Sequence, residues 1–149
     1  MESLELYARE GEIKARINRH FLERLQLGRI QTPQSASYYA DVIALFDRIH
    51  GFVDKEVVLF VEELKSFERG DAAVKTINRH GDYVRELLHD LVNLHIDEPD
   101  GSFAVGLSEL TAEFEQLIRV MQESLASLNH EQSDGLDLSH LQVLATQAA

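Results

Sequence analysis

The chain has 149 residues, the size of one domain, and its 26 acidic and 14 basic residues give a formal net charge of -12. It has no cysteine, which excludes disulfides, thiolate metal ligands and a cysteine nucleophile. A chain with this negative charge is repelled by nucleic acids and by anionic lipid. No run of apolar residues approaches the roughly 20 residues that are needed to span a bilayer. We therefore expect a cytoplasmic protein that binds basic partners or cations and no nucleic acid.

The first predicted helix covers residues 4–27, where apolar residues recur at helical spacing. Its stripe consists of Leu6, Ile13, Ile17, Phe21 and Leu25. Gly28 marks the end of the helix, because glycine is a natural C-terminal stop. We expect this stripe to face the core of the fold.

The second predicted helix runs from Pro33 to about Phe67, since Thr32 can cap it and proline suits the first helical position. Its stripe has one weak turn at Glu56 and Val57, and consists of Tyr39, Val42, Phe46, Ile49, Val53, Phe60 and Leu64. A second apolar line on this helix consists of Ile43, Val57, Val58 and Val61. This line favours a homodimer; the alternative is that the C-terminal tail covers it.

A third predicted helix begins where Gly70 can close the second and Asp71 can provide a cap. It carries a strict heptad of Val74, Ile77, Gly81, Val84, Leu88, Leu91 and His95. Gly81 in this stripe predicts the close approach of a neighbouring helix; the alternative is a break in the helix.

A fourth predicted helix follows Pro99. Its stripe consists of Leu107, Leu110, Phe114, Leu117, Met121 and Leu128. After a polar stretch, a short fifth segment carries Leu138, Leu141, Leu144 and Ala145.

Short connections between long helices make neighbouring helices antiparallel. The sequence therefore predicts an all-α fold: an antiparallel up-down helical bundle of four long helices plus a short C-terminal helix. The bundle is expected over residues 1–130, and residues 131–149 are expected to form a linker and the short helix or a flexible tail.

Two of the predicted helices carry carboxylate and imidazole groups on one face. Those of the second helix are Asp47, His50 and Asp54, and those of the third are Glu86, His89 and Asp90. Such groups bind divalent transition metals, but a di-iron bundle also needs inward glutamates from the other two helices, which are missing here. The alternative, which we favour, is that these groups are solvated flanks of packing stripes and that the chain holds no cofactor.

The sequence has no Gly-rich phosphate loop and no serine or threonine in a hydrolase elbow. A histidine phosphotransfer bundle needs a lysine and small residues directly after its histidine, and neither His50 nor His80 has them. We therefore expect no enzyme.

Two stretches of the sequence resemble consecutive helices of a known family. EGEIKARINRHFLERLQLG contributes His20, Leu22, Arg24 and Leu25, and QSASYYADVIALFDRIHGFV contributes Ser35, Ser37, Asp41, Val42, Ile43, Arg48 and Ile49. The region 12–64 is similar to a repeat of the PhoU-like family, and most similar to the cytosolic C-terminal region of bacterial sodium/phosphate cotransporters.

The resemblance implies a helical domain that regulates phosphate uptake or phosphate signalling by binding a protein partner. It implies contact with a membrane only through a parent or partner transporter, at the cytoplasmic face. The family's metal motif is incomplete here, because Gly51 replaces its second carboxylate. Asp41 and Arg48 are expected to make an interhelical or partner-facing polar contact. The alternatives are a metal-binding bundle and a generic dimeric scaffold.

Overall fold

The computed structural model describes residues 2–26, 36–68, 70–93 and 102–148. Its elements are α1 (Glu2–Gln26), α2 (Ala36–Gly51), η1 (Phe52–Glu56), α3 (Val57–Leu64), α4 (Asp71–Val92) and α5 (Ser102–Ala148). The described residues contain no strand, so the predicted all-α class is confirmed. The predicted features at Gly28, Thr32, Pro33, His95 and Pro99 lie outside the described residues.

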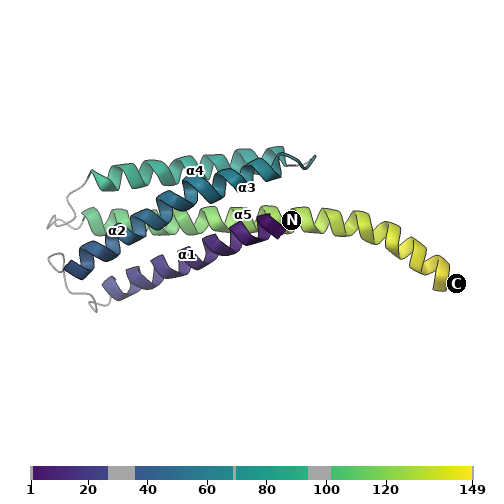
Figure 1. The fold of residues 1–149 in the computed structure, drawn as a ribbon, viewed down its shortest axis with the longest axis horizontal. Coiled ribbons are helices and arrows are strands. Elements are labelled where there is room, and N and C mark those ends of the chain that lie inside the picture. The colour runs from purple at the N-terminus through teal and green to yellow at the C-terminus, as the bar shows by residue number, and fades with distance from the viewer. Residues whose placement is uncertain (1, 27–35, 69, 94–101, 149) are drawn as a thin grey trace.

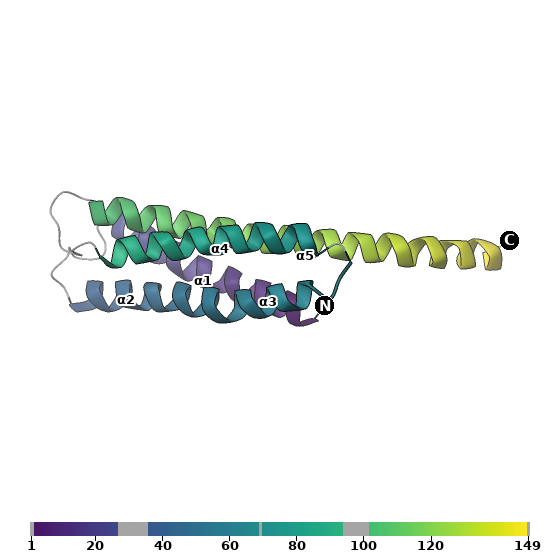
Figure 2. The ribbon, with the colours of Figure 1, turned by 90° about the horizontal axis from the view of Figure 1, so that it is seen from above.

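The helices lie side by side along one axis (Figures 1 and 2). The elements α2, η1 and α3 form one continuous rod, and α5 packs against both α1 and α4. The rod in turn contacts α1 and α4 through α2 and α3. The end of α1 and the start of α2 lie at the same end of the molecule as the end of α4 and the start of α5 (Figure 1). Each helix therefore contributes one face to a shared core.

Three of the four predicted stripes face this core. The fully buried members of the second, third and fourth stripes are Val42, Ile49, Phe60, Leu64, Ile77, Leu107, Leu110, Phe114, Leu117 and Met121. Burying side chains of this size contributes roughly 1.5–3 kcal/mol each relative to exposure, which is the main source of stability in such a fold.

The stripe predicted for α1 is wrong in three of its five members. Leu6, Ile13 and Ile17 are 53%, 45% and 45% exposed. The buried side of α1 instead carries Leu4, Ala8, Gly11, Ala15, Asn18 and Leu22. The physical reason is close packing: a Cβ atom on Gly11 would lie 2.4 Å from Cδ1 of Ile118 and 2.6 Å from Cζ of Phe52.

The weak turn in the second stripe coincides with a turn of π-helix, η1. The amide of Val57 donates to the carbonyl of Phe52, five residues earlier, rather than to that of Val53. A π turn adds a residue to the helical repeat and rotates the face that follows. Val57 and Val61 are therefore buried, and the second apolar line keeps only Ile43 and Val58 at the surface.

The helix α5 is a single element of 47 residues, so the predicted separate C-terminal helix is wrong. Its last part projects beyond the other helices (Figures 1 and 2). The polar stretch with Gly135 does not interrupt the helix, because an isolated glycine costs a helix only about 1 kcal/mol relative to alanine. The domain division at residue 130 stays a prediction.

Two glycines on helix interiors allow a matched test of this packing. Gly11→Ala should lower the free energy of unfolding by about 1–3 kcal/mol, because Phe52 and Ile118 must move. Gly81→Ala should raise it by roughly 0.5–1 kcal/mol through helix propensity, because no described atom lies within 4 Å of its Cβ position. Urea unfolding of both variants measures the two effects, and a Gly11→Ala variant as stable as the wild type would contradict the packing.

The same open space shows that Gly81 does not provide a close helix approach, and α4 continues through it without a break. Both sequence-based interpretations of Gly81 were therefore wrong.

Candidate functional site

A groove of about 540 Å³ lies between α2 and α4 and holds most of the predicted polar candidates. Its lining consists of Ile43, Phe46, Asp47, His50, Asp54, Arg85, Leu88, His89 and Val92. The apolar members come from both helices, and Ile43 and Val92 remain 57% and 58% exposed. The groove is therefore an apolar channel with charged and imidazole groups along it.

Asp54 in η1 is the centre of the polar part of the groove. Its Oδ2 lies 2.9 Å from Nε2 of His50, and its Oδ1 accepts a hydrogen bond of 3.1 Å from Nε of Arg85. The side chain of Asp54 is 44% exposed, so each ion pair contributes at most about 1 kcal/mol. The pairs orient these side chains across the groove more than they stabilise the fold.

Arg85 links α4 to the π turn. Its Nη2 donates to the backbone carbonyl of Val53 at 3.2 Å, and its Nη1 donates to Asp82 at 3.0 Å. The Val53 carbonyl lies inside η1, and the Val57 amide bonds to Phe52 instead. Arg85 therefore donates a hydrogen bond to the Val53 carbonyl at the place where the π turn changes the pattern of backbone hydrogen bonds along the helix. Sequence reasoning missed Arg85, because no spacing on α4 alone points to partners on η1.

The remaining predicted candidates divide between the groove and other surfaces. His89 and Asp47 line the groove; Nε2 of His89 lies 3.4 Å from Nδ2 of Asn93. Glu86 belongs to a different hollow, on the side of α4 that faces Glu113 of α5. Asp90 is exposed and does not line the groove.

Of the six metal ligands predicted from the sequence, four therefore line the groove and two, Glu86 and Asp90, lie elsewhere. In the described part of the chain, no three His, Asp or Glu side chains are grouped so that they could hold a metal ion.

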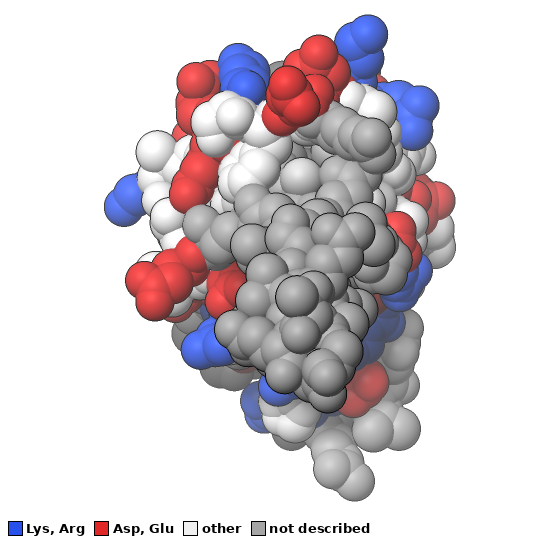
Figure 3. Space-filling view, turned by 90° about the vertical axis from the view of Figure 1, so that its right-hand side faces the viewer, with Lys and Arg blue, Asp and Glu red and all other residues white. Residues whose placement is uncertain are grey.

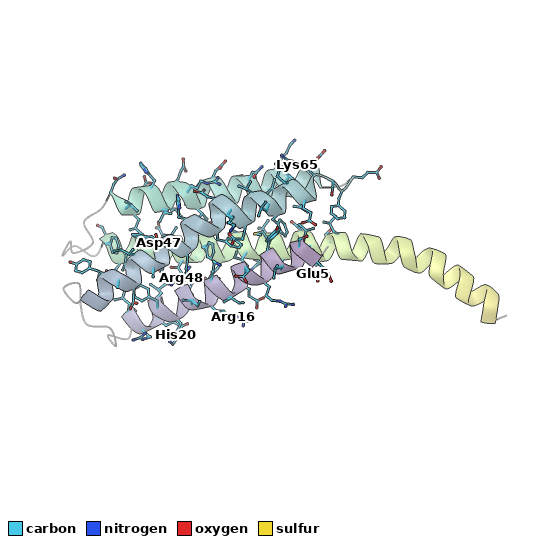
Figure 4. All side chains as sticks on the ribbon, in the orientation of Figure 1. Glu5, Arg16, His20, Asp47, Arg48 and Lys65 are labelled. Carbon is cyan, nitrogen blue, oxygen red and sulfur yellow. The ribbon has the colours of Figure 1, made fainter. Side chains whose placement is uncertain are left out.

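Arg48 lies on a different side of α2 from Asp47 and extends toward α1 (Figure 4). Its Nε donates to Oδ1 of Asn18 at 2.8 Å. Burial lowers the pKa of Arg48, and the carboxylate of Asp41 opposes that shift. Asn18 is fully buried, and its Nδ2 has no partner among the described residues. Of the two contacts expected for Arg48, this position favours the interhelical one.

Lys or Arg and Asp or Glu side chains lie beside one another around the end of the bundle drawn in Figure 3. The described surface on this side therefore presents charges of both signs rather than a field of one sign. No helix in the described ranges combines the length and the apolar character needed to cross a bilayer.

Comparisons of the chain with protein-family models, with curated proteins and with solved structures find no match.

Arg85→Ala tests the link between α4 and the π turn. We expect a small loss of stability, up to about 1 kcal/mol, together with faster amide hydrogen exchange confined to residues 53–58. The control is Arg79→Ala on the same helix, which does not line the groove and should leave this exchange unchanged. Equal exchange in both variants would contradict the link.

Proposed function

We propose that the chain is a non-enzymatic interaction domain whose groove between α2 and α4 binds an amphipathic, basic helix of a protein partner. The observation that carries this proposal is the pair of exposed apolar rims, Ile43 on α2 and Val92 on α4, above Phe46 and Leu88. A helix binds such a groove by burying its apolar face between the rims.

Charge supports a basic partner. Asp47 lines the groove and forms no ion pair with any described residue, so it offers a carboxylate to an incoming Lys or Arg. The net charge of -12 attracts a basic segment over a longer range and speeds its association.

The regulatory context of this proposal comes from the sequence. Residues 12–64 resemble a PhoU-like repeat, and Ile43, Asp47 and His50 of the groove fall within that region. We therefore propose that the partner belongs to a phosphate transport or phosphate signalling system and that the domain acts at the cytoplasmic face of the membrane. In this proposal the molecule is an up-down antiparallel bundle, which holds the two rims at a fixed spacing.

A designed peptide of Leu and Lys that forms an amphipathic helix provides a defined probe. Fluorescence anisotropy should show binding that weakens at least about tenfold, or about 1.4 kcal/mol, in the double variant Ile43→Ser, Val92→Ser, which removes both apolar rims without changing the charge. The control is Val105→Ser on α5, which is 61% exposed, does not line the groove, and should bind as the wild type does. Equal affinity in all three proteins, or equal binding of a Leu and Glu peptide, would contradict the groove.

Phosphate uptake tests the regulatory context separately. In cells whose copy of the gene has been deleted, the wild-type chain should restore the normal response of uptake to external phosphate, and the groove double variant should not. Unchanged uptake after deletion would remove the link to phosphate while leaving the peptide result intact.

A divalent transition-metal site is the second candidate function, and it uses the same groove. Two imidazoles and two carboxylates line it: Asp47, His50, Asp54 and His89. Imidazole and carboxylate are suitable ligands for Zn²⁺. These four side chains are not grouped for an ion as they stand, so metal binding would require Asp54 to exchange its pairing with His50 and Arg85 for the ion and the other side chains to turn toward it.

Calorimetric titration with Zn²⁺ tests this candidate. If the groove binds Zn²⁺, we expect saturable binding to the wild type that is lost in His50→Ala and in His89→Ala. Binding should be retained in His80→Ala, because the side chain of His80 lines a different hollow. Binding that is equal in all three variants would show that the groove is not the site.

A further inference from the structure

Both carboxylate oxygens of Asp54 are bound at the polar end of the groove. Oδ2 lies 2.9 Å from Nε2 of His50, and Oδ1 accepts a hydrogen bond of 3.1 Å from Nε of Arg85. The side chain of Asp54 is 44% exposed and lines the groove, so a basic side chain of a bound helix can reach it. Such a side chain would compete with Arg85 for the same carboxylate.

A helix that occupies the groove extends from its apolar end to Asp54. Along the rod, Asp54 lies seven residues after Asp47 and eleven residues after Ile43. At the helical rise per residue these intervals correspond to about 10 Å and about 16 Å, or roughly two and three turns. A partner helix of at least three turns that packs beside Ile43 therefore reaches both carboxylates. Basic residues two turns apart on that helix would face Asp47 and Asp54.

Arg85 connects Asp54 to the π turn. Its Nη2 donates to the backbone carbonyl of Val53 at 3.2 Å. In a regular α-helix this carbonyl would accept from the amide of Val57, four residues later, but that amide donates to Phe52 here. The Val53 carbonyl thus has two alternative donors, Arg85 in the π turn and Val57 in a regular turn. Arg85 favours the π turn because it replaces the hydrogen bond that the regular turn would provide.

We propose that binding of a basic helix in the groove is coupled to the π turn through Arg85. A Lys or Arg of the partner pairs with Asp54, Arg85 loses its ion pair, its hydrogen bond to Val53 weakens, and residues 53–58 open more often. This inference rests on the function proposed above and concerns the regulation of the same groove. Coupling of this kind is reciprocal, so a change that tightens the π turn would weaken partner binding.

The packing around Phe52 and Val57 limits the size of the change. The ring of Phe52 packs on Phe114 with centroids 5.6 Å apart, and Gly11 lets α1 approach the same ring. Val57 is 3% exposed, so its burial maintains the π turn as the major arrangement when Arg85 is released. We therefore expect a shift in the local opening equilibrium and not a rearrangement of the rod.

Amide hydrogen exchange with and without the Leu and Lys peptide measures the coupling. In the wild type, saturating peptide should accelerate exchange of residues 53–58 about two- to fivefold, which is the effect of losing one exposed ion pair. The variant Asp54→Ala should show the faster exchange without peptide, and the peptide should cause no further increase.

Asp82→Ala is the matched control for this experiment. Asp82 also pairs with Arg85, at 3.0 Å from Nη1, but it does not line the groove. A bound helix therefore does not compete for it, and the variant should retain the acceleration of residues 53–58 by the peptide.

Peptide affinity tests the reciprocal effect. Arg85→Ala should bind the Leu and Lys peptide about two- to fivefold more tightly, because the peptide no longer competes with Arg85 for Asp54. The control Arg79→Ala removes the same charge from α4 at a position that does not line the groove, and its affinity should equal that of the wild type.

The outcomes separate this inference from the function proposed above. Peptide binding without faster exchange of residues 53–58, or an acceleration that persists in Asp54→Ala, would overturn the coupling and leave the groove as a binding site. Equal peptide affinity in Arg85→Ala and Arg79→Ala would also overturn it. A wild-type chain that binds no peptide would overturn the function of the groove, and the coupling with it.

Discussion

The close contact around Phe52 is the constraint on which the rest of the structure depends. Its ring packs edge to face on Phe114 of α5, with centroids 5.6 Å apart, and the absence of a side chain on Gly11 lets α1 approach both Phe52 and Ile118. Three elements, α1, η1 and α5, therefore meet at one aromatic side chain. Because only the side of α1 with small residues permits this approach, the same contact turns Leu6, Ile13 and Ile17 outward. The bidentate pair between Arg19 and Glu115 joins α1 to α5 on the same side and raises the pKa of the arginine through its hydrogen bond.

The sequence predicted the helical class and three of the four buried faces, because in those helices the most regular stripe of large apolar residues is the one that is buried. Helix α1 has two apolar sides, one of large residues and one of small residues, and periodicity alone favours the large ones. The choice between them is made by Phe52 and Ile118, which lie 41 and 107 positions away from Gly11 in the chain. For the same reason, spacing placed Asp47, His50 and Asp54 on one face of the predicted second helix but could not show that Glu86 faces a different hollow from His89. The relative rotation of two helices depends on contacts that neither helix contains.

The π turn connects the packing of the core to the groove. Phe52, Val53 and Val57, within and directly after this turn, are all buried, and Asp54 lies at the surface between them. Arg85 then bonds both to the carboxylate of Asp54 and to the carbonyl of Val53. One guanidinium thus joins the altered backbone of η1 to α4 and, with His50, sets the charged part of the groove. A change in the pairing of Asp54 would therefore affect both a ligand bound in the groove and the conformation of the π turn.

The position of the groove in the bundle follows from which helices touch. Helix α1 makes its main contacts with α5, α3 and α2, and α4 makes its main contacts with the same three elements, so α1 and α4 lie on opposite sides of the bundle. The apolar outward face of α1, with Leu6, Ile13 and Ile17, is therefore a surface separate from the groove between α2 and α4. A partner helix in the groove would contact α2 and α4 and leave the close packing of α1 on Phe52 and Ile118 unchanged.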